Sequence, residues 1–522
     1  MNKIEYSLNN YDISEKFGVK TSFWDYLSLL SGNLILIPLG IVSVAMATRI
    51  LGAEGYGYIT IFNLIMTFVV MVTTNWTAPS LIRFGREEYD QKGKLNQTFW
   101  ARTIILIPCL LIGVSIVYFL RSFISDYMQM ASWIVWLVIG SVLVTTARTY
   151  FDYILQGIHS MKAYAASQIV FGAVSLAGLT LIFVGFFPKA YLTVIIVGLI
   201  TNIITLLFLT FFLIPLRLLS PVNTDRRMLR EVLSFSYPLM VGNLAAYIVN
   251  WVDVIVIKYY FSMSKVGEYQ LAYNIFNVLT GLFSSTTILI TPILISFLAA
   301  KREDLVLRYT TRLVPQGFLL WTTMIGIALS ISPPIFRKVF GEGFSVSAIY
   351  FQFLAIGLVI SGLINFYSGE ITAYKLIKLG VMASVARGLV NLIGDILLVP
   401  QMGPLAAALS TTGGIIIAAL FYLLICQRLI QEKILWQFIL ILPALLSLGI
   451  SRILSGPETP FLATVVTLMS SFFLARVLHL FRSDDLVLLE YIQMPVPLKK
   501  TIVWIYPFLT NETKKRKNTW IC

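Results

Sequence analysis

The sequence is divided into long runs of apolar residues, and this pattern constrains the fold more than any other feature. A helix rises about 1.5 Å per residue, so about 20 residues cross the ~30 Å hydrocarbon core of a membrane. Fourteen runs of roughly this length or longer follow one another. They lie near residues 24–48, 57–82, 98–120, 131–157, 163–186, 190–216, 232–257, 267–298, 313–334, 346–372, 379–398, 404–425, 434–454 and 459–480.

The composition leads to the same class of protein. Of the 522 residues, 58% are hydrophobic and only 12% are charged, whereas a soluble globular chain carries about 25% charged residues. Backbone polar groups in hydrocarbon need partners within the protein, and runs of this length are too long for barrel strands. We therefore predict an all-α polytopic membrane protein with about 14 transmembrane helices.

The positions of the basic residues predict the orientation. If the N-terminus is inside, 27 of the 39 Lys and Arg residues fall on the cytoplasmic side, 7 on the opposite side and 5 within the runs. Lys and Arg accumulate in short cytoplasmic loops. Both termini are therefore expected in the cytoplasm, and the net charge of +14 reflects membrane orientation rather than a nucleic-acid partner.

The first twelve runs contain a weak internal repeat. Gly32 and Asn33 in the first run correspond to Gly242 and Asn243 in the seventh, at an offset of 210 residues. Three more matches keep the same order: Gly55 with Gly267 at 212, Pro79 with Pro292 at 213, and Arg86 with Arg302 at 216. Chance similarity between apolar segments is the alternative explanation. A true repeat of six spans inserts both halves in the same orientation, as in many transporters.

The repeat and the basic segments predict the domain organisation. The second half ends before the last two runs, which are additional helices. The predicted parts are a cytoplasmic N-terminal segment 1–23, an N-terminal six-helix lobe 24–217, a cytoplasmic linker 218–231, a C-terminal six-helix lobe 232–426, two additional transmembrane helices 434–480 and a basic cytoplasmic tail 481–522. The tail either lies on an anionic inner leaflet or is a disordered basic segment.

Few ionisable residues lie inside the runs, and each is costly in hydrocarbon unless it faces a cavity or a partner. Arg148 and Asp152 are four residues apart in the fourth run, where they can pair on one helix face. A structural ion pair and a functional site explain this pair equally well. Arg387, Asn391 and Asp395 form a stripe at the same spacing in the eleventh run, and we expect this stripe to face protein or water.

Amide and phenol side chains line one face of each of two further runs. These groups hydrogen-bond sugar hydroxyls and stack on sugar rings, although polar contacts between helices are an equally simple explanation. The seventh run carries Asn243, Tyr247 and Asn250, followed by Asp253, and the eighth carries Tyr273, Asn274 and Asn277.

Other ionisable residues lie near the ends of runs. Arg49, Arg102 and Glu370 have such positions, where an interfacial charge is the simple interpretation. The sequence also lacks a GxxxxGK[ST] phosphate-binding loop and a Cys/His cluster with metal-ligand spacing. We therefore expect no catalytic residues, no metal site and no bound cofactor.

Three stretches resemble a known family. They are ATRILGAEGYGYITIFN after the first run, RFGREEYDQKGK after the second and VGEYQLAYNIF at the start of the eighth. They are similar to bacterial polysaccharide-biosynthesis membrane proteins, the oligosaccharide-lipid flippases of the multidrug/oligosaccharidyl-lipid/polysaccharide exporter superfamily. The resemblance covers about residues 20–480 and specifies the family better than any substrate.

The resemblance implies two six-helix lobes and alternating access. The implied substrate is a polyprenyl-diphosphate-linked oligosaccharide, moved from the inner to the outer leaflet of the cytoplasmic membrane of a bacterium. Because family cavities are cationic, Arg49, Arg148 and Arg387 become candidates for binding the diphosphate. Asp152, Asp253 and Asp395 depart from a purely cationic cavity, and they are candidates for coupling to Na⁺ or H⁺.

Three other functions fit the same sequence. The first is a multidrug or cation antiporter of the same superfamily, which needs an acidic residue deep in a lobe. The second is a flippase for lipid II. The third is a non-transporting membrane component of a polysaccharide assembly complex. The expected partners are the lipid-linked oligosaccharide, membrane lipids, and a polysaccharide polymerase or glycosyltransferases.

Overall fold

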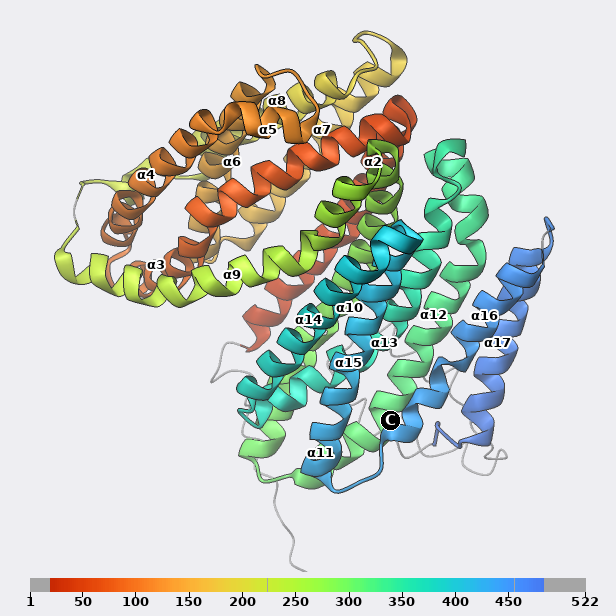
Figure 1. Cartoon of the computed structure of the whole chain (residues 1–522). Helices are drawn as coiled ribbons and strands as arrows, with labels where there is room; N and C mark the ends of the chain where they lie inside the picture. Colours follow the sequence, from red (N-terminus) through yellow and green to blue (C-terminus); the bar gives the residue numbers. More distant parts are fainter. Residues whose placement is uncertain (1–18, 223, 455, 483–522) are drawn as a thin grey trace, which may run out of the picture. The chain divides into compact units, whose positions relative to one another are not determined.

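The computed structural model describes residues 19–222, 224–454 and 456–482 (Figure 1). Within these ranges it contains α-helices and short 3-10 or π-helical turns and no β-strand. Twelve helices in the described part are long and apolar enough to cross a membrane. The prediction of an all-α polytopic membrane protein is therefore confirmed. Most of the predicted segment 1–23 and of the predicted tail 481–522 lies outside the described residues.

The contacts within the chain divide it into two compact units, and each is described here by itself. Unit 1 contains the residues up to Leu51 and Tyr58–Asn250, and unit 2 contains Gly52–Gly57 and the residues from Trp251 onward. The predicted lobe boundaries at 217 and 232 stay a prediction.

Unit 1 is built from the helices of the first half of the chain. Its core includes the fully buried Leu81, Leu95, Ile154 and Leu155. The elements are α2 (Val19–Thr73, which crosses both units), η1 (Asn75–Thr77), α3 (Ala78–Lys92), α4 (Asn96–Phe119), α5 (Arg121–Met128), α6 (Ile134–Gly157), α7 (Met161–Val184), α8 (Tyr191–Phe208), η2 (Leu209–Leu213), η3 (Leu216–Leu219) and the first part of α9 (Arg226–Tyr260).

Unit 2 contains the end of α9 and the remaining helices. α13 is its central helix, because it packs against α10, α12 and α15 and most of its residues are buried. The elements are α10 (Met263–Ala299), α11 (Glu303–Arg308), η4 (Tyr309–Leu313), α12 (Val314–Ile335), η5 (Phe336–Phe340), η6 (Glu342–Phe344), α13 (Ser347–Ala373), α14 (Ile377–Met402), α15 (Pro404–Ile430), η7 (Leu435–Ile441), α16 (Leu442–Ile453) and α17 (Thr459–Val477).

The fourteen predicted runs and the twelve candidate spans differ at α2 and α10. The predicted runs 24–48 and 57–82 meet within α2, which continues through the non-helical Gly52 (φ 65°, ψ −177°). Glycine adopts this left-handed φ without a side-chain clash. The run 267–298 lies in α10 (Met263–Ala299), which includes the apolar stretch Ile290–Ala299 among the described residues. The other eleven runs each correspond to one candidate span.

The second predicted run is wrong at its end. Instead of one helix to residue 82, α2 ends at Thr73, η1 follows, and α3 begins at Ala78. Pro79 stands in the first turn of α3, where its missing N–H leaves no hydrogen bond unmade. The side chains of Thr73 and Thr74 bond back to the carbonyls of Val69 and Val70, which gives the chain local partners at this break.

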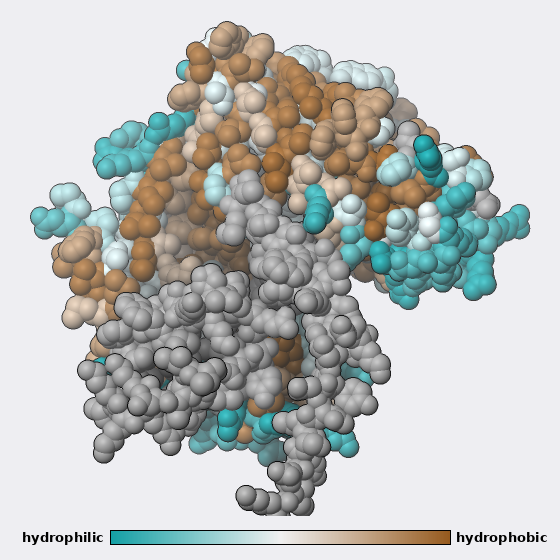
Figure 2. Space-filling model, turned by 180° about the vertical axis from the view of Figure 1, so that it is seen from behind, coloured by the Kyte–Doolittle hydropathy of each residue, from teal (hydrophilic) through white to brown (hydrophobic). Residues whose placement is uncertain are grey.

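Apolar side chains cover much of the surface in Figure 2, where hydrophobic residues are brown and the hydrophilic ones gather in a few patches. α14 is an example, because Val385, Leu389 and Ile396 are all more than half exposed. Soluble monomers rarely expose apolar surface so extensively. The surface therefore fits a lipid environment.

Two glycines allow a close backbone contact inside unit 2. A Cβ atom on Gly57 would lie 2.0 Å from the carbonyl oxygen of Met263, and one on Gly267 would lie 2.0 Å from that of Ala53. The contact is reciprocal, and both Gly57/Gly267 and Ala53/Met263 are 210 residues apart. This spacing equals the offset between Gly32 and Gly242, and the predicted correspondence of Gly55 with Gly267 stays a prediction.

We expect Gly57→Ala and Gly267→Ala each to destabilise the protein by about 1–3 kcal/mol, because the added methyl group meets a backbone carbonyl that cannot rotate away. Thermal unfolding of the detergent-solubilised protein measures the effect. Gly198→Ala in α8 is the control, since a Cβ there meets no atom within 4 Å. Variants at 57 and 267 that unfold at the wild-type temperature would contradict the close packing.

Candidate functional site

Three of the predicted site residues come together in unit 2. Asp253 lies near the end of α9, and Asn391 and Asp395 lie one turn apart on α14. All three are buried, with at most 3% of each residue exposed. The stripe expected on the eleventh run therefore faces protein here, and we refer to Asp253, Asn391, Asp395 and the residues that contact them as the carboxylate cluster.

Asp253 accepts hydrogen bonds from three other helices. Its Oδ1 accepts from Nδ2 of Asn391 at 2.9 Å, and its Oδ2 accepts from the hydroxyl of Thr411 at 2.9 Å. The hydroxyl of Tyr269 on α10 also donates to Oδ2. The side chain of Asp253 therefore binds the end of α9 to three other helices of unit 2.

Asp395 has the opposite surroundings. It is fully buried beside Asp253 and Ser410 and interacts with both, but among the described residues neither of its oxygens makes a hydrogen bond of ordinary geometry. The same holds for the hydroxyl of Ser410. Two adjacent carboxyl groups cannot both be ionised in an apolar interior unless a cation lies between them. A proton or a small cation bound by these oxygen atoms would therefore remove the repulsion within the carboxylate cluster.

The third residue of the α14 stripe lies on the same side. Arg387 interacts electrostatically with Asp253 and with Tyr273 of α10. Gly414 on α15 allows this close packing, because a Cβ there would lie 2.6 Å from the carbonyl oxygen of Arg387. The carboxylate cluster thus combines two carboxyl groups with one guanidinium.

The polar residues predicted on the eighth run lie on α10 of unit 2. Nδ2 of Asn274 donates to the hydroxyl of Tyr56 at 2.8 Å, and Oδ1 of Asn274 accepts from Gln270 at 2.8 Å. Tyr273 is buried and hydrogen-bonds Asn277, which is exposed. These contacts bind α10 to residues 52–57, so the amide of Asn274 already serves as a contact between helices.

In unit 1, Arg148 and Asp152 lie close together on α6, as predicted. Nη2 of Arg148 is 3.8 Å from the Asp152 carboxylate, and the guanidinium lies 4.3 Å from the ring centroid of Phe171. Asp152 also accepts hydrogen bonds from Ser167 at 2.5 Å and from Gln168 at 3.1 Å. Nε and Nη1 of Arg148 are buried and have no hydrogen-bond partner among the described residues. Arg148 therefore keeps two donors for an anion.

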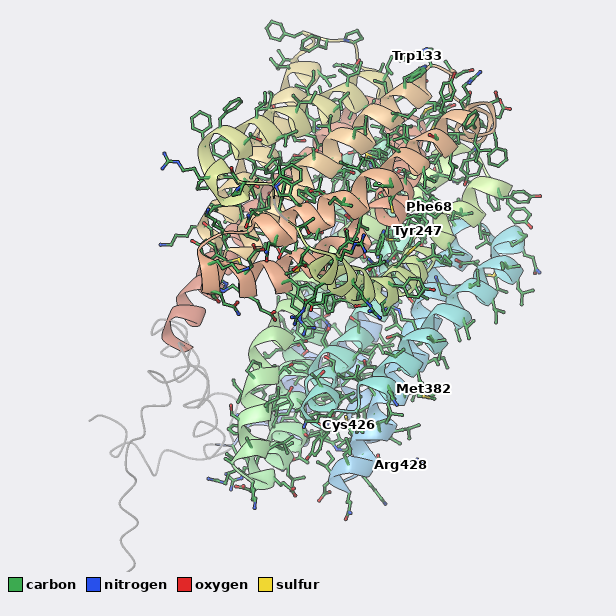
Figure 3. All side chains as sticks on the ribbon, turned by 90° about the vertical axis from the view of Figure 1, so that its left-hand side faces the viewer. Phe68, Trp133, Tyr247, Met382, Cys426 and Arg428 are labelled. Carbon is green, nitrogen blue, oxygen red and sulfur yellow. The ribbon has the colours of Figure 1, made fainter. Side chains whose placement is uncertain are left out.

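The other candidates in unit 1 have different surroundings. Tyr247 is buried beside Phe68, with ring centroids 5.2 Å apart, and donates its hydroxyl to the carbonyl of Leu64 at 2.9 Å (Figure 3). Asn250 donates to the carbonyl of Ala246, one turn back on α9. Asn243 is half-buried and Arg49 is exposed. Asn243, Tyr247 and Asn250 thus belong to unit 1, whereas Asp253 on the same helix belongs to unit 2.

Sequence reasoning missed the partners of the buried carboxyl groups. Tyr269, Ser410 and Thr411 lie on α10 and α15, and their position opposite Asp253 depends on which helices pack together. The signal available in the sequence was the polar stretch STTGG at 410–414 within an otherwise apolar run.

Sequence reasoning also misinterpreted Arg102, which is not an interfacial charge. Only 2% of the residue is exposed, Nε donates to the hydroxyl of Thr77 at 3.0 Å, and the guanidinium lies 4.2 Å from the ring centroid of Tyr150. A buried guanidinium is stabilised by such an aromatic face. Arg102 therefore binds α4 to η1 and α6 inside unit 1.

The fold and the buried charged groups define a class of protein, a polytopic membrane protein with the fold of a transporter. Solved structures show the same fold. A lipid II flippase MurJ in an inward closed conformation aligns with a TM-score of 0.66 at 16% identity, covering 87% of this chain and 99% of that chain. A multidrug resistance MATE family transporter of the MOP superfamily aligns with a TM-score of 0.57 at 14% identity, covering 78% and 98%.

Sequence comparison then gives the family. The family described as polysaccharide biosynthesis protein matches residues 24–298, more than half of the chain. The chain belongs to this family.

Two individual proteins are similar to this chain at low sequence identity. A probable low-salt glycan biosynthesis flippase, Agl15 of Haloferax volcanii, is 24% identical over 184 residues, which are 35% of this chain and only 39% of that protein. An uncharacterized membrane protein of Methanocaldococcus jannaschii, MJ1068, is 22% identical over 392 residues, which are 72% of this chain and 69% of that protein.

The two carboxyl groups of the carboxylate cluster should differ in what their removal does to stability. We expect Asp253→Asn to destabilise the protein by about 1–3 kcal/mol, because an amide nitrogen would then face the donors that now bind the carboxylate. Asp395→Asn removes one of two adjacent acids and should leave stability unchanged or higher. Thermal unfolding at neutral pH measures both, and the reverse order of stabilities would contradict the difference in hydrogen bonding between Asp253 and Asp395.

Proposed function

We propose that this protein flips a polyprenyl-diphosphate-linked oligosaccharide from the inner to the outer leaflet of the cytoplasmic membrane of a bacterium by alternating access. Membership of the polysaccharide biosynthesis family is the observation that carries the proposal. The fold of transporters and the name of the Haloferax relative, a probable glycan biosynthesis flippase, support it.

Arginine side chains bind the diphosphate in this proposal. A guanidinium donates two parallel hydrogen bonds to phosphate oxygens. Arg148 is the first choice, because two of its buried nitrogens have no partner among the described residues and its carboxylate neighbour is 3.8 Å away and also bound by Ser167 and Gln168. Arg49 and Arg387 are the further candidates. Asn243, Tyr247, Asn250, Tyr273, Asn274, Asn277 and Asn391 stay candidates for contacts with the sugars.

The carboxylate cluster is the proposed site of ion coupling. Na⁺ and H⁺ both bind where carboxyl oxygens lack other partners, and Asp395 and Ser410 supply such oxygens beside the carboxylate of Asp253. A bound cation removes the repulsion between the two acids and so stabilises one arrangement of α9, α14 and α15. Asp152 in unit 1 is a weaker candidate, because Arg148, Ser167 and Gln168 already surround it.

The membrane potential is a second source of energy. An interior-negative potential favours outward movement of an anion by about 2.3 kcal/mol per charge at 100 mV. We expect both termini in the cytoplasm. The substrate enters from the inner leaflet, where its sugars are assembled. A glycosyltransferase that supplies the substrate and a polymerase that consumes it are the expected partners.

One observation favours a second function, the multidrug or cation antiporter. Such a transporter needs an acidic residue deep in a lobe, and Asp395 of unit 2 is fully buried. The fold is also that of a lipid II flippase. These functions differ in substrate, so the same deletion experiment separates them.

Cells that lack this protein should accumulate a polyprenyl-diphosphate-linked oligosaccharide in the inner leaflet. We expect wild-type protein to clear it, and Arg148→Ala and Arg387→Ala to clear it at least about tenfold more slowly, since each loses charge-assisted hydrogen bonds to phosphate. Mass spectrometry of extracted lipids measures the amount.

Arg148→Lys and Arg337→Ala are the controls for this experiment. Lysine keeps the charge but loses the bidentate fork, so it should restore clearance only in part. Arg337 is exposed and pairs with Glu342 at 2.7 Å, so its loss should have no effect. Accumulation of lipid II instead would favour the lipid II flippase. Sensitivity to cationic drugs without any accumulated lipid would contradict the proposal and favour the antiporter.

A further inference from the structure

A buried glutamate lies in a part of unit 2 that the proposed function does not use. Glu370 is near the C-terminal end of α13, and none of its surface is exposed, so its interpretation as an interfacial charge is wrong. Cys426 of α15 faces its carboxyl group. Cys426 is 15 residues after Thr411 of the carboxylate cluster, which places the two sites about 22 Å apart along α15. They are therefore separate sites.

Glu370 has no positively charged partner. No Lys, Arg or His among the described residues forms an ion pair with it, and Oε2 accepts no hydrogen bond from any of them. The titratable groups that face it are the thiol of Cys426 and the phenols of Tyr309, Tyr367 and Tyr374. All of these are neutral at neutral pH. An ionised carboxylate in such surroundings would have only the hydroxyl of Thr310 and the thiol of Cys426, and no cation, to replace its hydration.

The hydrogen bonds of Thr310 require one more proton than its hydroxyl supplies. Its Oγ1 is 3.0 Å from the carbonyl oxygen of Val306, and it is also hydrogen-bonded to Oε1 of Glu370. The carbonyl oxygen has no proton and only accepts. If the hydroxyl proton is donated to Val306, the bond to Glu370 needs a proton from the glutamic acid itself. Both bonds form together only when Glu370 is protonated.

We propose that Glu370 is a proton-binding site, occupied at neutral pH, whose carboxylic acid O–H donates to Thr310. The bound proton stabilises a contact between three elements, α13, η4 and η7. Thr310 lies in the π-helical turn η4, and its carbonyl accepts from Nε2 of Gln437 in η7 at 3.3 Å. Oε1 of Gln437 in turn accepts from the hydroxyl of Tyr367 at 2.6 Å. π-helical turns occur frequently at functional sites.

The connection to η7 gives the proton a structural consequence. η7 leads directly into α16, and α16 packs with α17 against α12. Release of the proton would place an unpaired charge beside η4 and leave Thr310 with one hydroxyl proton for two acceptors. One of its two hydrogen bonds would then be lost, which weakens the attachment of η7. Figure 3 shows Cys426 inside unit 2 and Arg428, two residues later, at the end of α15. Cys426, which faces the proton site, is thus about one turn from the end of α15.

The test is infrared spectroscopy of the purified full-length protein as pH is raised. The C=O stretching band of protonated carboxyl groups reports the bound proton directly. We expect wild type at neutral pH to contain a band component that Glu370→Gln removes and Asp395→Asn leaves in place. We also expect the thermal stability of wild type to fall as pH rises from the pH at which the unfolded chain releases this proton to the pH at which the folded protein releases it, because over this interval the folded protein binds more protons than the unfolded chain.

Glu370→Gln should abolish this part of the pH dependence, because its amide is neutral at every pH and donates to Thr310 in place of the acid. Glu342→Gln, at an exposed carboxyl group, is the matched control and should leave the pH dependence unchanged. If Glu370→Gln retains the whole band and the same pH dependence, the proposal is wrong. If this variant does not fold, the S–H stretching band of Cys426 in wild type decides, since a band that does not shift with pH contradicts the proposal. These measurements need no substrate, so they are independent of the proposed function.

Discussion

A polar group buried between apolar helices has only other helices to bind, and this constraint determines how unit 2 is assembled. Asp253 is the most demanding group, because it needs donors from outside its own helix. Asn391, Thr411 and Tyr269 supply them, and in doing so they bind α9 to α14, α15 and α10. Asp395, beside it, receives no such donor. In our proposal, the difference between two adjacent carboxyl groups, one hydrogen-bonded by three helices and one not, lets this site bind a cation.

The same constraint explains the other buried charges and the close backbone contacts. Arg102 is stabilised by an aromatic face and a hydroxyl, and Glu370 by a bound proton in our proposal. Glycines let helices that are joined in this way come close together, as Gly57 and Gly267 do beside the hydrogen bond between Tyr56 and Asn274. The hydrophobic effect cannot drive association between helices in lipid. Close packing through small residues at the helix contacts drives it instead. Polar bonds thus select the neighbours, and glycines determine how near they come.

The sequence predicted the helices well because their signal is local. A run of apolar residues defines a span, and the spacing of Arg387, Asn391 and Asp395 correctly indicated a face turned towards protein. The positions of partners could not be predicted in this way, since helical periodicity orients a residue on its own helix and does not identify the helix opposite. Tyr269 and Thr411 were missed for this reason. Arg102 and Glu370 were misinterpreted because nearness to the end of a run does not reveal whether a neighbouring helix covers the residue.

The central claim is that this chain moves a lipid-linked oligosaccharide across a membrane and that a cation bound at Asp253 and Asp395 drives it. Proteoliposomes that contain the purified protein and a polyprenyl-diphosphate oligosaccharide test this directly. An enzyme added outside modifies only the sugars in the outer leaflet, and the modified fraction is followed with and without a gradient of Na⁺ or H⁺. The account predicts that wild type moves the substrate faster under one of these gradients and that Asp395→Asn no longer responds to it. Equal movement in liposomes with and without protein would contradict the account.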